Sequence, residues 1–156
     1  MSRRRIAKKR SITLDPIYGD IKIAKFINIL MLRGQKTTAE NILYKSLAKA
    51  SKKSSIDCLE LFHKALENVR PLVEVRSRRV GGATYQVPVD VNESRSWVLG
   101  MRFIIQSARK KTGSDMASRL SIELMDAYNK KGDAIKLKEE KHKTAEANRA
   151  FSQFRW

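Results

Sequence analysis

The sequence predicts a mainly α-helical single domain of six helices, with a two-stranded β-hairpin that protrudes between the third and fourth helices. Three observations predict this architecture. Apolar residues recur at helical spacing in six separate stretches. One segment of β-branched residues, 73–91, lies between the third and fourth stretches and is interrupted by Gly81-Gly82. A length of 156 residues is typical of one domain, and a hydrophobic content of 42% is enough for its core.

The chain begins with a basic arm, residues 1–14, and the helical domain follows over residues 15–156. The arm contains no acidic residue and six cations: Arg3, Arg4, Arg5, Lys8, Lys9 and Arg10. A run of like charges of this kind does not fold alone and becomes ordered on a polyanion.

The first helix follows the turn predicted by Asp15-Pro16. We expect it to be central and buried, because apolar residues surround most of its circumference, and to end at Gly34 in a left-handed cap. Lys22 and Lys25 share its narrow polar side. The sequence Thr37-x-x-Glu40 predicts a capping box for the second helix.

A polar linker at residues 51–55 then separates the second helix from the third. Pro71 stops the third helix, and the hairpin arm begins, which we place at residues 72–89.

The hairpin carries arginines on both faces. Gly81-Gly82 supplies the positive φ angles of a two-residue turn. The simplest register makes three cross-strand pairs: Val80 with Ala83, Arg79 with Thr84, and Arg78 with Tyr85. Neighbouring residues of a strand point to opposite faces, so Arg78 and Arg79 leave neither face able to lie against a core. We therefore expect the hairpin to project from the body and to bind a polyanion.

The fourth helix carries three arginines seven residues apart, Arg95, Arg102 and Arg109, on a face separate from its apolar stripe. Arg109, Lys110 and Lys111 then lead into a turn. Ser114 is the expected cap of the fifth helix. The sixth helix opens at Gly132-Asp133 and is mostly charged.

The chain ends in aromatic residues, among them Phe151, Phe154 and Trp156. Such residues can dock on the body or stack on nucleic-acid bases, and the sequence leaves both alternatives open.

Charge gives the strongest functional indication. The chain has 33 Lys and Arg against 16 Asp and Glu, a net charge of +17, and a pI near 10.3. A basic balance of this size is typical of nucleic-acid-binding proteins.

Motifs for catalysis, metals and membranes do not occur in the sequence. His63 and His142 fall on different predicted helices, and Cys58 is the single cysteine, so a common Cys/His zinc site is excluded. There is no phosphate-binding loop, no G-x-S-x-G and no long apolar stretch. We expect no enzyme, no cofactor, no metal, no small-molecule substrate and no membrane partner.

Two kinds of nucleic-acid binder remain. One is an RNA-binding component of a large particle; the other is an architectural DNA-binding protein whose β-ribbon arm enters the minor groove. Positive charge spread over the N-terminal arm, the hairpin and the fourth helix favours a partner that surrounds the protein. Basic extensions that fold on binding suit a folded RNA. We favour the RNA particle.

Specific motifs then indicate a family. They are S-R-R-R at 2–5, D-P-I-Y at 15–18, K-F-I-N-I-L-M at 25–31, T-A-E-N-I-L-Y at 38–44, E-N-V-R-P at 67–71, S-R-R-V-G-G-A-T-Y-Q-V-P-V at 77–89, A-E-A-N-R-A-F at 145–151 and the terminal R-W. Over nearly its full length the chain resembles the small-subunit ribosomal protein seven family of bacteria and organelles.

The resemblance implies a structural protein that binds small-subunit ribosomal RNA and nucleates assembly of its 3′ major (head) domain. It also implies neighbours: exit-site transfer RNA, messenger RNA, and other head and platform ribosomal proteins. The expected location is the ribosome in the bacterial cytoplasm or the plastid stroma, with the mitochondrion as the less favoured compartment. One departure is Gln35, where the family often has lysine.

Two sets of site residues follow. The cations expected to bind ribosomal RNA are Arg3, Arg4, Arg5, Lys8, Lys9, Arg10, Lys22, Lys25, Lys36, Arg76, Arg78, Arg79, Arg95, Arg102, Arg109, Lys110 and Lys111. The residues that the resemblance places near transfer RNA and messenger RNA are Arg79, Val80, Gly81, Gly82, Ala83, Arg149 and Trp156.

Overall fold

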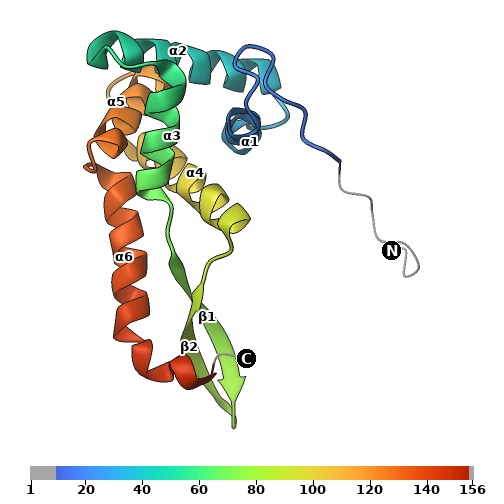
Figure 1. Ribbon diagram of the computed structural model, residues 1–156, viewed down its shortest axis with the longest axis vertical. Coiled ribbons are helices and arrows are strands. Elements are labelled where there is room, and N and C mark those ends of the chain that lie inside the picture. The colour runs from blue at the N-terminus through green and yellow to red at the C-terminus, as the bar shows by residue number, and fades with distance from the viewer. Residues whose placement is uncertain (1–9, 155–156) are drawn as a thin grey trace.

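A computed structural model provides the structure of the chain and describes residues 10–154 (Figure 1). The elements in this range are α1 (Ile21–Leu30), α2 (Lys36–Ser54), α3 (Cys58–Val69), β1 (Val73–Val80), β2 (Ala83–Asp90), α4 (Glu93–Lys110), α5 (Met116–Tyr128), α6 (Asp133–Ala147) and the 3₁₀ helix η1 (Arg149–Phe154). The mainly helical fold with a hairpin between α3 and α4 is confirmed, and η1 is added to the six expected helices.

Helix α5 is the centre of the helical body. It packs against α2, α3, α4 and α6, and its apolar side, including Leu120 and Leu124, is fully buried. Helix α1 packs against α2 and α4 at the edge of the body (Figure 1). The expected central position of the first helix is therefore wrong, although its inner side is buried: Ile23 and Phe26 are fully buried, whereas Ile21 on the outer side is 49% exposed.

The turn between α1 and α2 differs from the prediction at both helix ends. Helix α1 ends at Leu30, where the N–H of Met31 donates to the carbonyl oxygen of Ile27 at 2.9 Å. Gly34 has the expected positive φ of 77°, but it lies in the turn beyond the cap. The capping box is wrong, because α2 already begins at Lys36 and its N-cap, Gln35, makes no side-chain hydrogen bond.

The predicted boundaries of two further helices, both placed at polar residues, differ from the observed ones. The expected linker at residues 51–55 is helical up to Ser54, and Ser55, with a left-handed φ of 56°, ends α2. The Ser54 hydroxyl donates to the carbonyl oxygen of Ala50 at 2.9 Å, so its side chain is satisfied inside the helix. At α5 the N-cap is Asp115 and not Ser114.

The hairpin forms in the predicted register. Strands β1 and β2 are antiparallel, with Val80 opposite Ala83, Arg79 opposite Thr84 and Arg78 opposite Tyr85. Gly81 and Gly82 have φ angles of 56° and 89°, which a two-residue turn of this kind requires. The hairpin extends away from the helical body beside α6 (Figure 1).

One face of the hairpin is covered, contrary to the expectation that neither could be. Val87 is fully buried, and the Tyr85 ring contacts the rings of Phe151 and Phe154 in η1. The terminal aromatics within the described residues therefore dock on the protein. Beyond Tyr85, Arg78, Arg79, the two turn glycines, Ala83 and Thr84 are exposed, and Val80 is half-buried.

Candidate nucleic-acid interface

Cations from α1 and α4 lie along the seam between these two helices. We define the α1–α4 basic face as Lys22, Lys25, Arg102, Arg109 and Lys110. Two open grooves follow the seam. Lys22 and Lys25 line the first together with Trp97, and the three cations of α4 line the second. Sequence positions more than 70 apart thus meet on one surface.

The first groove is organised by Trp97. The Lys22 ammonium lies 3.7 Å from the centroid of the Trp97 ring, and the Arg70 guanidinium lies 4.8 Å from it. Cation–π contacts of this kind are favourable and fix the position of the cation. Lys25, beside them, makes no ion pair within residues 10–154, so its charge remains available.

The three arginines of α4 have different surroundings. Arg95 pairs with Glu74 of β1 at 2.9 Å. The Nη2 group of Arg109 donates to the carbonyl oxygen of Leu30 at 3.0 Å, which is favourable at the negative C-terminal end of α1. Arg102 is exposed and has no polar partner in the described part of the chain. Two of the three arginines of α4, Arg95 and Arg109, therefore have a partner within the protein.

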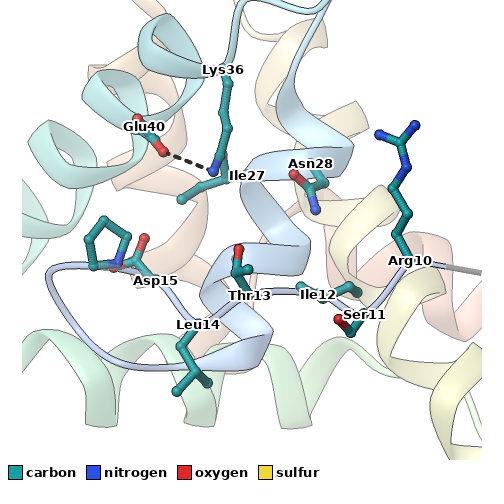
Figure 2. A pocket seen from close by; sticks show the side chains of 12 residues that line it. Arg10, Ser11, Ile12, Thr13, Leu14, Asp15, Ile27, Asn28, Lys36 and Glu40 are labelled. Carbon is teal, nitrogen blue, oxygen red and sulfur yellow. Dashed lines mark ion pairs between the residues drawn. The ribbon is translucent and has the colours of Figure 1, made fainter.

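The segment before α1 forms a pocket that brings Arg10 and Lys36 together (Figure 2). Asn28 and Thr13 also line it, and Lys36 pairs with Glu40 at 3.5 Å across its wall. Both cations were predicted to bind RNA, and they come from opposite sides of α1 in the sequence. The acidic side chains of Asp15 and Glu40 line the same pocket, so its two cations are balanced by two carboxylates and it has no excess positive charge.

The buried carboxylate of Asp15 holds this segment in place. Its Oδ1 accepts a hydrogen bond from the Tyr44 hydroxyl at 2.6 Å, and its Oδ2 accepts from the backbone N–H of Tyr18 at 2.9 Å. Burial and the hydrogen bond to Asp15 raise the pKa of Tyr44 above its ordinary value. The sequence motif Asp-Pro-Ile-Tyr is thus an anchor that places Arg10 beside α1.

The ribbon tip, residues 78–83, is a second and separate cationic surface. Arg78 and Arg79 are both exposed on it. Figure 1 places the tip at the opposite end of the molecule from α1 and α2. The predicted set of RNA-binding cations is therefore divided between two places, and no single pocket collects it.

At the base of the ribbon, two solvent-accessible arginines pair with one carboxylate of the protein. Glu74, whose side chain is 12% exposed, accepts from Arg76 and Arg95, each at 2.9 Å. Burial alone would raise the pKa of Glu74, but the hydrogen bonds from these two arginines outweigh it and lower the pKa. Arg76 and Arg95 were predicted to bind RNA; in the structure the Arg95–Glu74 pair joins α4 to the ribbon, and Arg76 pairs with the same carboxylate within β1.

Lys111 is likewise paired within the protein. Its ammonium lies 2.7 Å from the fully buried carboxylate of Glu123 and 3.1 Å from Asp126. Burial lowers the pKa of Lys111, but the hydrogen bonds to the two carboxylates outweigh it and raise the pKa. The other oxygen of Glu123 accepts from the N–H of Ala134 at 2.9 Å, so this pair joins α4, α5 and α6.

The remaining site residues lie at or beyond the ends of the described chain. Arg149, at the start of η1, is exposed and pairs with Glu146 at 3.3 Å. The predicted cations of residues 3–9 and Trp156 lie outside the described residues. Sequence reasoning missed Glu74 and Glu123, because their partners are distant in sequence, and nothing in the local pattern marks either as buried.

No group of three or more metal-ligating side chains occurs in residues 10–154. His63 lies 3.0 Å from Asp20, the N-cap of α1, and His142 accepts a hydrogen bond from the N–H of Leu72 at 3.0 Å. Both histidines are thus used to join elements. None of the helices in this range combines the length and apolar character needed to cross a bilayer.

The fold and these surfaces define a helical protein with exposed cations on its body and on its ribbon. Comparison with known proteins shows which family within this class the chain matches. The family model described as Ribosomal protein S7p/S5e matches residues 2–149. The chain belongs to this family, which confirms the resemblance seen in the sequence; it is a structural ribosomal protein and not an enzyme.

Individual relatives are similar over the whole length. The chain is 55% identical over 154 residues, 99% of each chain, to the small ribosomal subunit protein uS7 of Petrotoga mobilis. It is 54% identical to the protein of the same name from Blochmanniella pennsylvanica, and 51% identical to that from Nitrosococcus oceani, each over 156 residues and the full length of both chains.

Proposed function

We propose that this protein binds the ribosomal RNA of the small subunit directly, nucleates assembly of the 3′ major (head) domain, and lies beside the transfer-RNA exit site and the messenger-RNA path. In this proposal the α1–α4 basic face and the arm before it bind the RNA of the head domain. The ribbon tip and the neighbouring end of α6 face transfer RNA and messenger RNA. Other proteins of the head and platform would be its neighbours.

One observation carries the proposal. In a chain of net charge +17, four cations of the two surfaces, Lys25, Arg79, Arg102 and Lys110, have no acidic partner within residues 10–154. Cations without an acidic partner repel one another, and they are stabilised when RNA phosphates lie against them. Lysines and arginines that neutralise phosphates position a protein on RNA, while few contacts to base edges are needed.

The proposal is tested by the salt dependence of binding to an RNA fragment of the head domain. If about six to ten phosphates are contacted, affinity falls by about 10³–10⁵-fold between 50 and 200 mM salt. A nearly flat dependence would contradict the proposal.

Competition with bent duplex DNA separates this function from that of an architectural DNA-binding protein. We expect the DNA to displace the RNA fragment poorly, because two surfaces at opposite ends of the molecule suit an irregular folded RNA better than one bent duplex. Equal competition by the DNA would favour the architectural function.

A further inference from the structure

The ribbon is held along its side by the C-terminal part of the chain. Helix α6 runs beside it in Figure 1 and contacts both strands, and η1 contacts β2. At the base of the ribbon, the backbone N–H of Leu72 donates to Nε2 of His142 at 3.0 Å. This contact fixes where the ribbon leaves the body, but it lies far from the basic tip.

A second contact lies close to the tip. The centroid of the Tyr85 ring is 5.2 Å from that of Phe151 and 5.1 Å from that of Phe154. Aromatic pairs at these separations attract each other beyond the effect of burying their area. Tyr85 is opposite Arg78 in the register, so the three rings hold the ribbon directly below its tip.

The ribbon needs such a contact. An isolated two-stranded hairpin is marginally stable in water, and in the outer half of this one Tyr85 packs on η1, whereas Arg78, Arg79 and the turn glycines are exposed. Val87, two residues closer to the body on the same face, is already fully buried. Beyond Val87, the ring contacts of Tyr85 in the part of the chain that the structure describes come from η1.

We propose that η1 is a brace for the ribbon: Phe151 and Phe154, by packing on Tyr85, hold the basic tip in the orientation in which it binds. They are positioning residues, which act through Tyr85. The claim that the brace raises affinity for RNA rests on the proposed function, whereas the packing of η1 on the ribbon does not. A tip held in place before RNA arrives loses less conformational entropy on binding, so the brace raises affinity without a contact of its own.

Hydrogen–deuterium exchange without RNA tests the brace. In the full-length double variant Phe151→Ser/Phe154→Ser, we expect the backbone amides of β1 and β2 to exchange about tenfold faster or more, because two aromatic contacts are lost. The amides of α2 to α5 should keep their rates, which also shows that the variant folds. The matched control is Ser152→Ala/Gln153→Ala, which changes two exposed residues of the same 3₁₀ helix. Unchanged exchange in the ribbon of the phenylalanine variant would overturn the brace.

Binding of the head-domain RNA fragment tests the consequence. We expect the dissociation constant of the phenylalanine variant to rise by about three- to tenfold, and that of the control to stay unchanged. Faster exchange with unchanged affinity would overturn the role in binding. If the wild-type protein itself does not bind the RNA, the proposed function fails, and the exchange experiment still decides whether η1 braces the ribbon.

Discussion

The base and the tip of the ribbon are built from the same residue types and differ in what surrounds them. At the base, Arg76 shares Glu74 with Arg95 of α4, and that carboxylate is nearly buried. At the tip, Arg79 is exposed and has no partner in the described part of the chain. The first arrangement fixes the ribbon to the body, and the second leaves positive charge for a partner.

The same division occurs in the body. Lys110 and Lys111 are adjacent in sequence, yet Lys110 is exposed on the α1–α4 basic face while Lys111 pairs with the buried Glu123. The number of cations therefore does not say which of them bind RNA. The positions of the acidic residues indicate which cations stay available to a partner, because an ion pair within the protein neutralises its cation.

The largest expected effect is on a paired cation. Lys111→Met leaves the Glu123 carboxylate buried without its counter-ion, and we expect the free energy of unfolding to fall by about 3 kcal/mol. Denaturant unfolding measures this change. Affinity of the folded variant for the RNA fragment should stay within about twofold of the wild type. A stable variant that binds weakly would place Lys111 in the interface instead.

At the tip the opposite result is expected. Arg79→Ala removes an exposed cation, and we expect affinity for the RNA fragment to fall by about tenfold, since a hydrogen bond to a charged group contributes about 1.5–3 kcal/mol. The free energy of unfolding should change by no more than about 0.5 kcal/mol, as for other exposed positions. Filter binding and denaturant unfolding of one preparation give both values. Loss of helical structure in this variant would mean that the tip is structural.

Two arginines of one helix provide a matched pair. Arg102→Ala should weaken RNA binding by about tenfold and reduce the slope of the salt dependence by about one, with stability unchanged. Arg95→Ala should lower the free energy of unfolding by about 0.5–1 kcal/mol, because it breaks a pair that is partly exposed to solvent. Equal effects of both variants on both measurements would remove the distinction between paired and unpaired cations.

The smallest effect concerns the histidine at the ribbon base. Burial, together with the nearby Lys138, lowers the pKa of His142 below its ordinary value of 6.5. The folded state thus favours the neutral ring, so this contribution to stability is present above pH 6.5 and is lost as the pH falls through the lowered pKa. NMR titration should give His142 a midpoint below 6.5, with His63→Gln used for assignment. A midpoint at or above 6.5 would contradict the burial of this ring beside Lys138.

Local chemistry was enough to predict the ribbon and the helices, because their signals are contained in short stretches. Gly81-Gly82 determined the turn, and the turn determined the register of all eight residue pairs. The helix boundaries were less predictable. Thr37 and Glu40 have capping-box spacing, but α2 already begins at Lys36, so both residues lie inside the helix.

The division between paired and unpaired cations could not be predicted, because it depends on contacts distant in sequence. Glu74 and Arg95 are 21 residues apart, and they meet only after the ribbon has folded back to α4. The place of each helix in the body could not be predicted either. Helix α1 is as apolar as a central helix, but α5 packs against more of the other helices. Hydrophobic periodicity gives the buried face of each helix and not its place in the bundle.

A structure of the assembled small ribosomal subunit that contains this chain is the most direct test. The account predicts that Arg79 at the ribbon tip, and Lys25, Arg102 and Lys110 on the α1–α4 basic face, lie within hydrogen-bonding distance of RNA phosphates, while Lys111 and Arg95 keep their carboxylate partners. A ribbon tip and an α1–α4 basic face surrounded by solvent, with no sugar–phosphate chain near them, would contradict it.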